Sequence, residues 1–204
     1  ISHSLGAVPH MMIVKNRTNA IKWAVYHHRN TAAPETDHLQ LNDNVATSDD
    51  DSTWDDTAPT SSVFRVKSST STNGSSANYV AYLWTGKQGF SKFGGYTGNG
   101  SADGTYVYTG FRPAFVLFKG LNSNREWILA DNKRDPINEV DAVLYGNTND
   151  AEGDSDMVDF LSNGFKFIHA SGPGTINTSG ETYVYMAFAE QPLVNSNGVP
   201  GNAR

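Results

Sequence analysis

The sequence predicts an all-β protein made of two tandem, internally duplicated β-sandwich units of the jelly-roll or lectin-like type. Three observations predict this: short apolar runs bounded by turn residues, a repeat at a constant offset, and a composition rich in Ser, Thr, Asn and Gly with only 18 % charged residues. Small polar residues of these types belong to turns and to solvated strand faces. The length of 204 residues allows one or two domains with real cores.

A shift of the chain on itself by 104 residues aligns three kinds of feature. The Gly-x-x-Pro motif that ends at Pro9 falls on the one that ends at Pro113, and Trp23 falls on Trp127. The apolar run after the first motif also falls on the apolar run after the second. Agreement of three features at one offset favours a repeat over shared composition, and we expect these four residues in the two cores.

The strands are expected in the same order in both halves. Residues 11–14 and 115–118 are short apolar runs bounded by turn residues, as in strands buried on both faces. Residues 21–26 and 126–129 follow after Asn-rich turns and complete hairpins. Only residues 158–162 look helical, and this segment is too short to count as a helix.

Near the end of each predicted unit lies a segment whose residues alternate with the period of a β-strand. Residues 63–66 parallel residues 164–167, which places Phe64 and Phe165 in the core.

The last strands, residues 79–82 and 185–188, match at an offset of 106. The predicted domains are therefore a first sandwich over 1–87, a second over 88–190, and a tail over 191–204.

The second copy carries an additional strand-like segment, residues 89–96, before its Gly-x-x-Pro motif, and the first copy has no counterpart. Two explanations stay open. Either an upstream stretch of a longer chain supplies the strand, or a neighbouring chain supplies it by β-augmentation. Both explanations imply an assembly of several parts, and we expect a homo-oligomer.

Charge and cysteine content exclude several classes of partner and chemistry. The formal net charge is −6, and no basic cluster is longer than Lys133-Arg134, so we expect no nucleic-acid partner. No apolar run reaches the length of about 18 residues that a membrane-spanning helix needs, so we expect no membrane insertion. The absence of cysteine excludes disulfides, thiolate metal ligands and thiol catalysis.

Carboxylates gather between residues 43 and 56. Several oxygen ligands on one loop suit Ca²⁺, and Asp49, Asp51 and Asp55 are the candidate ligands, with no other cofactor expected. The spacing matches neither the EF-hand nor the nonapeptide calcium pattern, and acidic loops are commonly only solvated. A calcium site and a solvated loop both stay open.

The same loop and the polar loop 68–78 are the longest polar insertions, and loops carry recognition on a rigid sandwich. Asn and Asp side chains can hydrogen-bond sugar hydroxyls while an aromatic ring stacks on the sugar. Trp54 is either that ring or a core residue. The candidate ligand-binding residues are Asp49, Asp50, Asp51, Trp54 and Asn73.

No catalytic residues are expected. The chain contains no nucleophile elbow, phosphate loop, HExxH motif or dinucleotide fingerprint. A carboxylate pair such as Asp154 and Asp156 suits glycosidic chemistry only where the fold places it across a cleft. The sequence therefore predicts a binder that is not an enzyme.

Several motifs resemble those of tandem-repeat virion proteins of tailed bacteriophages, especially marine ones. The first motif is residues 54–57 (WDDT), followed by PTSSVF over 59–64, and it is similar to the earlier repeat of those proteins. The other motifs are residues 89–100 (GFSKFGGYTGNG), 108–113 (YTGFRP), 159–165 (DFLSNGF), 183–190 (YVYMAFAE) and 198–200 (GVP). The resemblance covers nearly the whole chain, although Ala7 and Val8 depart from the Phe-Arg of the second copy.

The resemblance implies a carboxy-terminal part of a tail fibre or related appendage, located in the virion and contacting other virion proteins. It favours a trimer as the oligomer and a bacterial surface glycan as the external ligand. Two alternatives are a purely structural capsid or tail decoration protein and a polysaccharide depolymerase.

Overall fold

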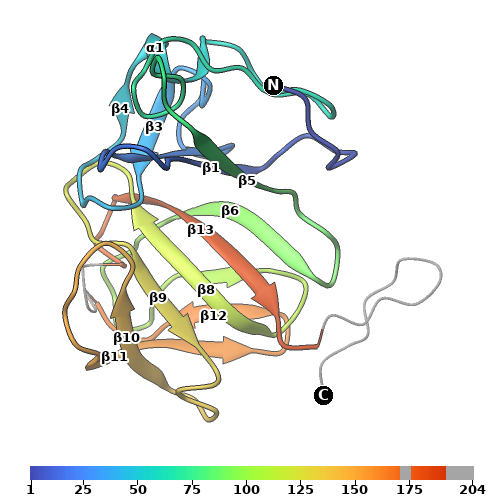
Figure 1. Ribbon diagram of the computed structural model, residues 1–204. Helices are drawn as coiled ribbons and strands as arrows, with labels where there is room; N and C mark the ends of the chain where they lie inside the picture. The colour runs from blue at the N-terminus through green and yellow to red at the C-terminus, as the bar shows by residue number, and fades with distance from the viewer. Residues whose placement is uncertain (171–175, 192–204) are drawn as a thin grey trace. The chain divides into compact units, whose positions relative to one another are not determined.

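The computed structural model describes residues 1–170 and 176–191, and these residues form an almost entirely β structure (Figure 1). The predicted all-β, sandwich-like fold class is confirmed. The chain divides into two compact units, Ile1–Thr85 and Gly86–Arg204, so the boundary lies two residues before the predicted one. The predicted tail, 191–204, lies outside the described residues except for Gln191.

Unit 1 contains a five-stranded antiparallel sheet in the order β4-β3-β2-β1-β5. Its elements are β1 (Met11–Asn16), β2 (Trp23–His27), β3 (Asp37–Gln40), β4 (Ser48–Asp49), the helical turn α1 (Asp51–Trp54) and β5 (Tyr79–Trp84). The apolar run at the start of β1 is buried, as the sequence predicts, because β1 has neighbours on both sides. Its core face joins β2, α1 and Phe64 in one apolar cluster.

Unit 2 contains an eight-stranded sheet in the order β6-β13-β8-β9-β10-β11-β12-β7, which curls into a nearly closed barrel. Its strands are β6 (Ser91–Thr97), β7 (Tyr106–Tyr108), β8 (Pro113–Gly120), β9 (Ile128–Asp131), β10 (Val140–Tyr145), β11 (Gly153–Leu161), β12 (Gly164–Phe167) and β13 (Thr182–Ala189). The two edge strands face each other, and the Lys92 ammonium of β6 donates to the Tyr108 carbonyl of β7 over 2.7 Å.

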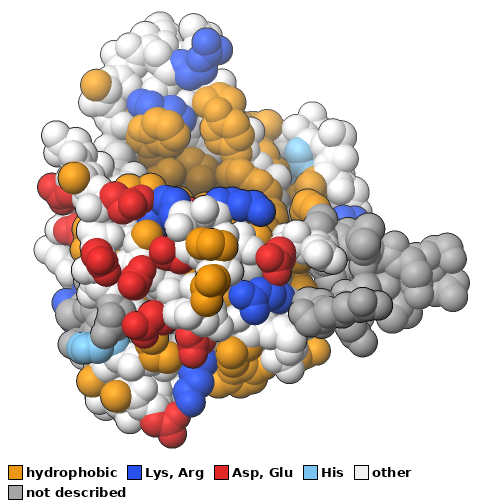
Figure 2. All heavy atoms as spheres, turned by 90° about the horizontal axis from the view of Figure 1, so that it is seen from below, with side chains coloured by type: hydrophobic (Ala, Val, Ile, Leu, Met, Phe, Trp, Pro, Cys, Tyr) orange, Lys and Arg blue, Asp and Glu red, His pale blue; other side chains and the backbone are white. Residues whose placement is uncertain are grey.

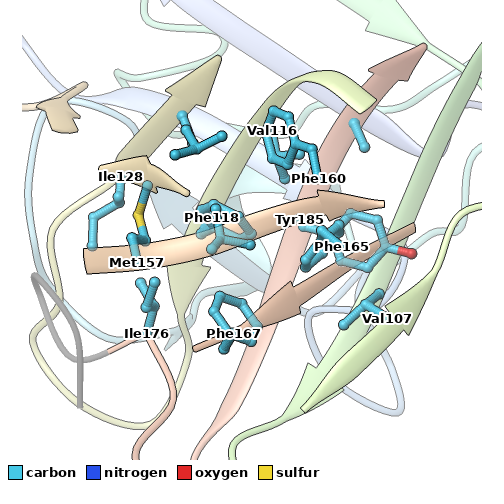
Figure 3. Packing of buried hydrophobic residues seen from close by; sticks show 14 of the residues in the cluster. Val107, Val116, Phe118, Ile128, Met157, Phe160, Phe165, Phe167, Ile176 and Tyr185 are labelled. Atoms are coloured by element: carbon cyan, nitrogen blue, oxygen red, sulfur yellow. The ribbon is translucent and has the colours of Figure 1, made fainter. Parts of the chain in front are cut away.

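Aromatic side chains fill the core of unit 2 (Figure 3). The rings of Phe118, Phe165 and Phe167 meet pairwise at centroid distances of 5.4–5.7 Å. Tyr96 stacks on Tyr183 at 4.8 Å and also contacts all three phenylalanines. Tilted and edge-on aromatic contacts add to the stabilisation from apolar burial.

Five of the six predicted core residues are buried: Pro9, Phe64, Pro113, Trp127 and Phe165. The prediction for Trp23 is wrong, because this side chain is only half-buried. Trp23 is the first residue of β2, at the end of the sheet, and the Lys15 ammonium covers its ring at 5.4 Å.

Two predicted elements differ from the structure. Residues 63–66 form only an isolated bridge, Ser2↔Val63, because their partner is the short extended segment beside Ile1. Residues 158–162, which look helical in the sequence, fall mostly within β11, where pairing with β10 and β12 overrides the local pattern. The helical turn lies instead at α1.

Strand pairing matches between the units at an offset of 104. β5 pairs with β1 from Asn16↔Tyr79 onward, and β13 pairs with β8 from Gly120↔Tyr183 onward. Tyr79 therefore corresponds to Tyr183, and the predicted offset of 106 for the last strands is wrong by two residues.

Trp23 and Trp127 make equivalent backbone hydrogen bonds in the two units. The N–H groups of Trp23 and Trp127 donate to the side-chain oxygens of Asn42 and Asn147, over 2.7 and 2.8 Å. The origin of the two units by duplication stays a prediction, since one sheet has five strands and the other eight.

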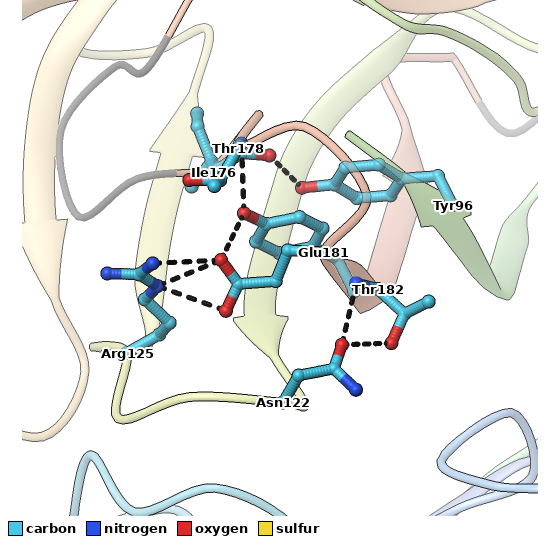
Figure 4. Close-up of polar contacts among 8 residues, drawn as sticks. Tyr96, Asn122, Arg125, Ile176, Thr178, Glu181 and Thr182 are labelled. Atoms are coloured by element: carbon cyan, nitrogen blue, oxygen red, sulfur yellow. Dashed lines mark hydrogen bonds and ion pairs between the residues drawn. The ribbon is translucent and has the colours of Figure 1, made fainter. Parts of the chain in front are cut away.

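An ion pair between a partly exposed guanidinium and a buried carboxylate anchors the loop after β8 to the start of β13 (Figure 4). The Arg125 guanidinium donates three hydrogen bonds of 2.9–3.1 Å to the carboxylate of Glu181. The Tyr183 hydroxyl donates to the same carboxylate and accepts from the N–H of Thr178. Burial raises the pKa of Glu181. The opposite effect of Arg125 and Tyr183 is larger, so the pKa of this carboxyl lies below its usual value.

We predict that Glu181→Gln lowers the free energy of unfolding at pH 7 by about 1–3 kcal/mol, because it leaves the Arg125 charge without its partner. The pKa of Glu181 in the folded chain lies below its ordinary value of 4.5. The contribution of the pair is therefore complete above about pH 4.5 and is lost as the pH falls further. Urea unfolding between pH 3 and pH 8 checks this.

The matched control is Glu152→Gln, which removes a half-exposed partner of Arg134. We expect a loss below about 1 kcal/mol for this variant. Equal losses in both variants, or a Glu181→Gln effect that grows on acidification, would contradict the assignment.

Candidate functional site

The acidic segment of unit 1 is organised around α1. Asp50 is the N-cap of this helical turn: its carboxylate accepts from the N–H of Ser52 over 2.9 Å and from the hydroxyls of Ser52 and Thr53. These hydrogen bonds, led by that of the Ser52 hydroxyl, lower the pKa of Asp50. Asp50 is thus held by its own helix and is not directed at a ligand.

The candidate calcium ligands do not converge. Asp51 forms an ion pair with Lys67 at 2.7 Å, and Asp55 forms one with Arg65 at 3.5 Å. Asp49 is exposed on β4. Among the residues that the structure describes, no group of three or more His, Asp or Glu side chains could hold a metal ion, so the calcium prediction for Asp49, Asp51 and Asp55 is not supported.

Trp54 is a core residue. Its side chain is 1 % exposed and meets Tyr26 edge-on, with ring centroids 6.1 Å apart. The sequence left open whether this ring stacks on a ligand, and the structure excludes that role in this conformation because the ring faces the sheet.

A shallow groove of about 530 Å³ brings two predicted residues together. Asp55 and Asn73 line it with Arg65 and aliphatic side chains, and the one aromatic residue in its wall, Phe64, is buried. Asn73 is exposed, and its amide donates to the Lys67 carbonyl over 2.6 Å. Without an exposed ring, the groove offers polar contacts but no surface on which a sugar could stack.

An exposed tyrosine pair lies in unit 2 on the edge strand β7. Tyr106 and Tyr108 are 44 % and 59 % exposed, while Val107 between them points into the core. Alternate residues of a strand share a face, so the two phenol rings stand on the same outer side. We call Tyr106, Tyr108, Lys92 and Asn163 the tyrosine ledge.

Polar groups surround the two rings. The Tyr106 hydroxyl donates to the side-chain oxygen of Asn163 over 2.8 Å. The Lys92 ammonium lies 5.2 Å from the centre of the Tyr108 ring. Burial raises the pKa of Tyr106, with a further contribution from Tyr108, and partial burial lowers the pKa of Lys92.

Two glycines lie beside the ledge. A Cβ on Gly164 would lie 2.2 Å from the Val107 carbonyl oxygen and 3.1 Å from the Tyr106 ring, so the close pairing of β12 with β7 requires glycine there. Gly110 adopts φ +87°, a conformation that favours glycine, beside the Tyr108 hydroxyl. Sequence analysis missed this site. The available signal was the aromatic-apolar-aromatic alternation of residues 106–108 just before the second Gly-x-x-Pro motif, which predicts a strand with two rings on one face.

Charge on the visible surface is mixed. On the face shown in Figure 2, Asp and Glu side chains are more widespread than Lys and Arg, and they lie among exposed apolar side chains. That face carries no continuous basic surface of the type that grips a phosphate backbone.

Comparison with protein families matches residues 1–192 to a domain of unknown function, DUF7483. The chain belongs to the DUF7483 family. The match spans both units, so the family domain includes the five-stranded and the eight-stranded sheet. Neither the curated proteins nor the solved structures yield a match to this DUF7483 chain. Its described residues include no helix long and apolar enough to cross a bilayer.

We predict that Asp50→Ala lowers the free energy of unfolding by about 0.5–2 kcal/mol, because it removes the N-cap of α1. The matched control Asp49→Ala changes an exposed neighbouring carboxylate and should stay within about 0.5 kcal/mol of the parent chain. Chemical denaturation of the three proteins checks this. A neutral Asp50→Ala variant would show that the cap does not stabilise the acidic segment.

Proposed function

We propose that this chain is a non-enzymatic virion protein of a tailed bacteriophage, part of a tail fibre or appendage, that binds a glycan of the bacterial surface. The observation that carries the binding role is the tyrosine ledge. The resemblance of motifs along nearly the whole chain to tandem-repeat phage virion proteins supports the location.

The chemistry of the ledge suits a sugar. A pyranose ring presents one apolar face of C–H groups and an equator of hydroxyls, so it is bound by an aromatic ring together with polar side chains beside it. Tyr106 and Tyr108 offer the rings, and Asn163 and Lys92 offer hydrogen-bonding groups next to them.

The rigidity of the ledge supports the same role. The Tyr106 hydroxyl and the Lys92 ammonium are already held by partners within the chain. Side chains that are ordered before binding lose less conformational entropy when a ligand arrives.

Assembly into a homo-oligomer, with a trimer favoured by the fibre resemblance, is part of the proposal, and contacts with other virion proteins follow from it. A purely structural decoration protein is the second candidate, favoured by the open sheet edge of unit 1. A depolymerase is the third. Incubation with bacterial polysaccharide, followed by chromatography of the products, separates the depolymerase from the other two.

We predict that the double variant Tyr106→Ala/Tyr108→Ala loses at least tenfold in affinity for the polysaccharide that the unmodified chain binds best on an array of bacterial surface glycans. Tenfold corresponds to about 1.4 kcal/mol, within the range expected for truncating stacked aromatic residues. Isothermal titration with that polysaccharide provides the measurement.

The matched control is Tyr82→Ala, which removes a 48 % exposed tyrosine from β5 in the other unit. Its affinity should equal that of the unmodified chain. If the unmodified chain binds nothing on the array, or if the ledge variant binds as well as the control with an intact circular dichroism spectrum, the ledge is not a glycan site.

A further inference from the structure

The sheet of unit 1 has an open edge at β5. β5 is the last strand in the order β4-β3-β2-β1-β5, and no strand in the described residues pairs with its outer side. In unit 2 the corresponding strand, β13, is paired with β8 on one side and β6 on the other. The match between β5 and β13 extends over all six residues of β5.

The backbone of β5 presents an ordered set of free hydrogen-bonding groups. The carbonyls of Asn78 and Trp84 accept from β1 and its flanks, so even-numbered residues of β5 face β1. In an antiparallel sheet, successive residues of a strand direct their backbone N–H and C=O groups to opposite sides. Tyr79, Ala81 and Leu83 therefore direct these groups to the open side of β5. In unit 2 the equivalent odd-numbered residues of β13 face β6. Just beyond the end of β6, the Gly98 N–H donates to the carbonyl of Glu181, which is also odd-numbered.

The edge also lacks the features by which exposed strands avoid pairing. The sequence of β5 is YVAYLW, with no charged residue and no proline over six residues, and its composition has high strand propensity. Ala81 and Tyr82 in its middle are exposed.

The core of unit 1 is incomplete at the same place. Tyr79 and Leu83 pack against its apolar cluster but are only partly buried. In unit 2, β6 contributes Tyr96, which is 9 % exposed, stacks on Tyr183 and belongs to the core. Tyr183 corresponds to Tyr79, so a strand on β5 would place an aromatic ring beside Tyr79.

We propose that β5 binds an extended segment with the sequence pattern of β6, presented by another polypeptide chain. The segment runs antiparallel to β5 and pairs its backbone with Tyr79, Ala81 and Leu83. Its aromatic residue, at the position of Tyr96, covers the partly buried rim of the unit 1 core. This is β-augmentation, in which main-chain hydrogen bonds supply affinity and alternate side chains supply specificity.

The test uses the full chain and a fluorescent peptide with the sequence of residues 89–99, GFSKFGGYTGN. We expect saturable binding by anisotropy. We also expect slower amide hydrogen exchange at Tyr79, Ala81 and Leu83. A peptide N-methylated at the position of Gly94, which pairs with Tyr185 in unit 2, should bind at least tenfold more weakly.

Two chain variants complete the test. Ala81→Pro removes an outward N–H and should weaken peptide binding at least tenfold, whereas Ala81→Ser keeps the N–H and should bind like the parent chain. The peptide arm and the exchange measurement stand even if Ala81→Pro fails to fold. The proposal is overturned by equal binding of the N-methylated peptide, by protection of β13 instead of β5, or by concentration-dependent dimerisation through β5 that excludes the peptide.

Discussion

Antiparallel pairing of β13 with a neighbour on each side is the interaction on which unit 2 depends. Along its length, β13 bonds to β8 on one side and to β6 on the other, and this fixes which of its side chains face inward. Tyr183 and Tyr185 thereby enter the aromatic core and meet Tyr96 and Phe165. The backbone ladder and the apolar core therefore specify the same register, since a slip of one residue would turn these rings to solvent.

Unit 1 has the same central pairing but lacks the outer neighbour among its described residues. β5 and β1 have the register of β13 and β8, yet the rim of the core beside β5 stays partly exposed. This difference supports the proposal that β5 binds a strand, because in unit 2 the corresponding strand β13 is paired with β6 on its outer side. It also separates the two proposed roles: glycan contact belongs to a face of unit 2, and assembly belongs to an edge of unit 1.

Local hydrogen bonds and ion pairs explain why the acidic loop is a weaker candidate binding site than the tyrosine ledge. The carboxylates of Asp50, Asp51 and Asp55 are each held by a helix cap or a basic neighbour, so the three do not converge on one ligand. On the ledge, the internal bonds of Tyr106 and Lys92 hold the groups but leave the rings exposed. The polar composition of the acidic loop suggests a binding site in the sequence. A binding surface, however, requires side chains that are accessible to a ligand after their contacts within the chain are made.

The sequence by itself determined the all-β class, the buried apolar runs of β1 and β8 and the burial of residues such as Phe64 and Phe165, because periodicity and apolar composition act locally. It also predicted that residues 89–96 lack a counterpart in the first half.

Only the tertiary structure decided that residues 158–162 lie mostly in a strand, that Trp23 is half-buried and that Tyr79 corresponds to Tyr183. It also decided that an exposed tyrosine pair stands on β7 and that the aromatic ring of the acidic loop, Trp54, is buried. Each of these depends on which strands become neighbours, and contacts between residues far apart in the chain determine that.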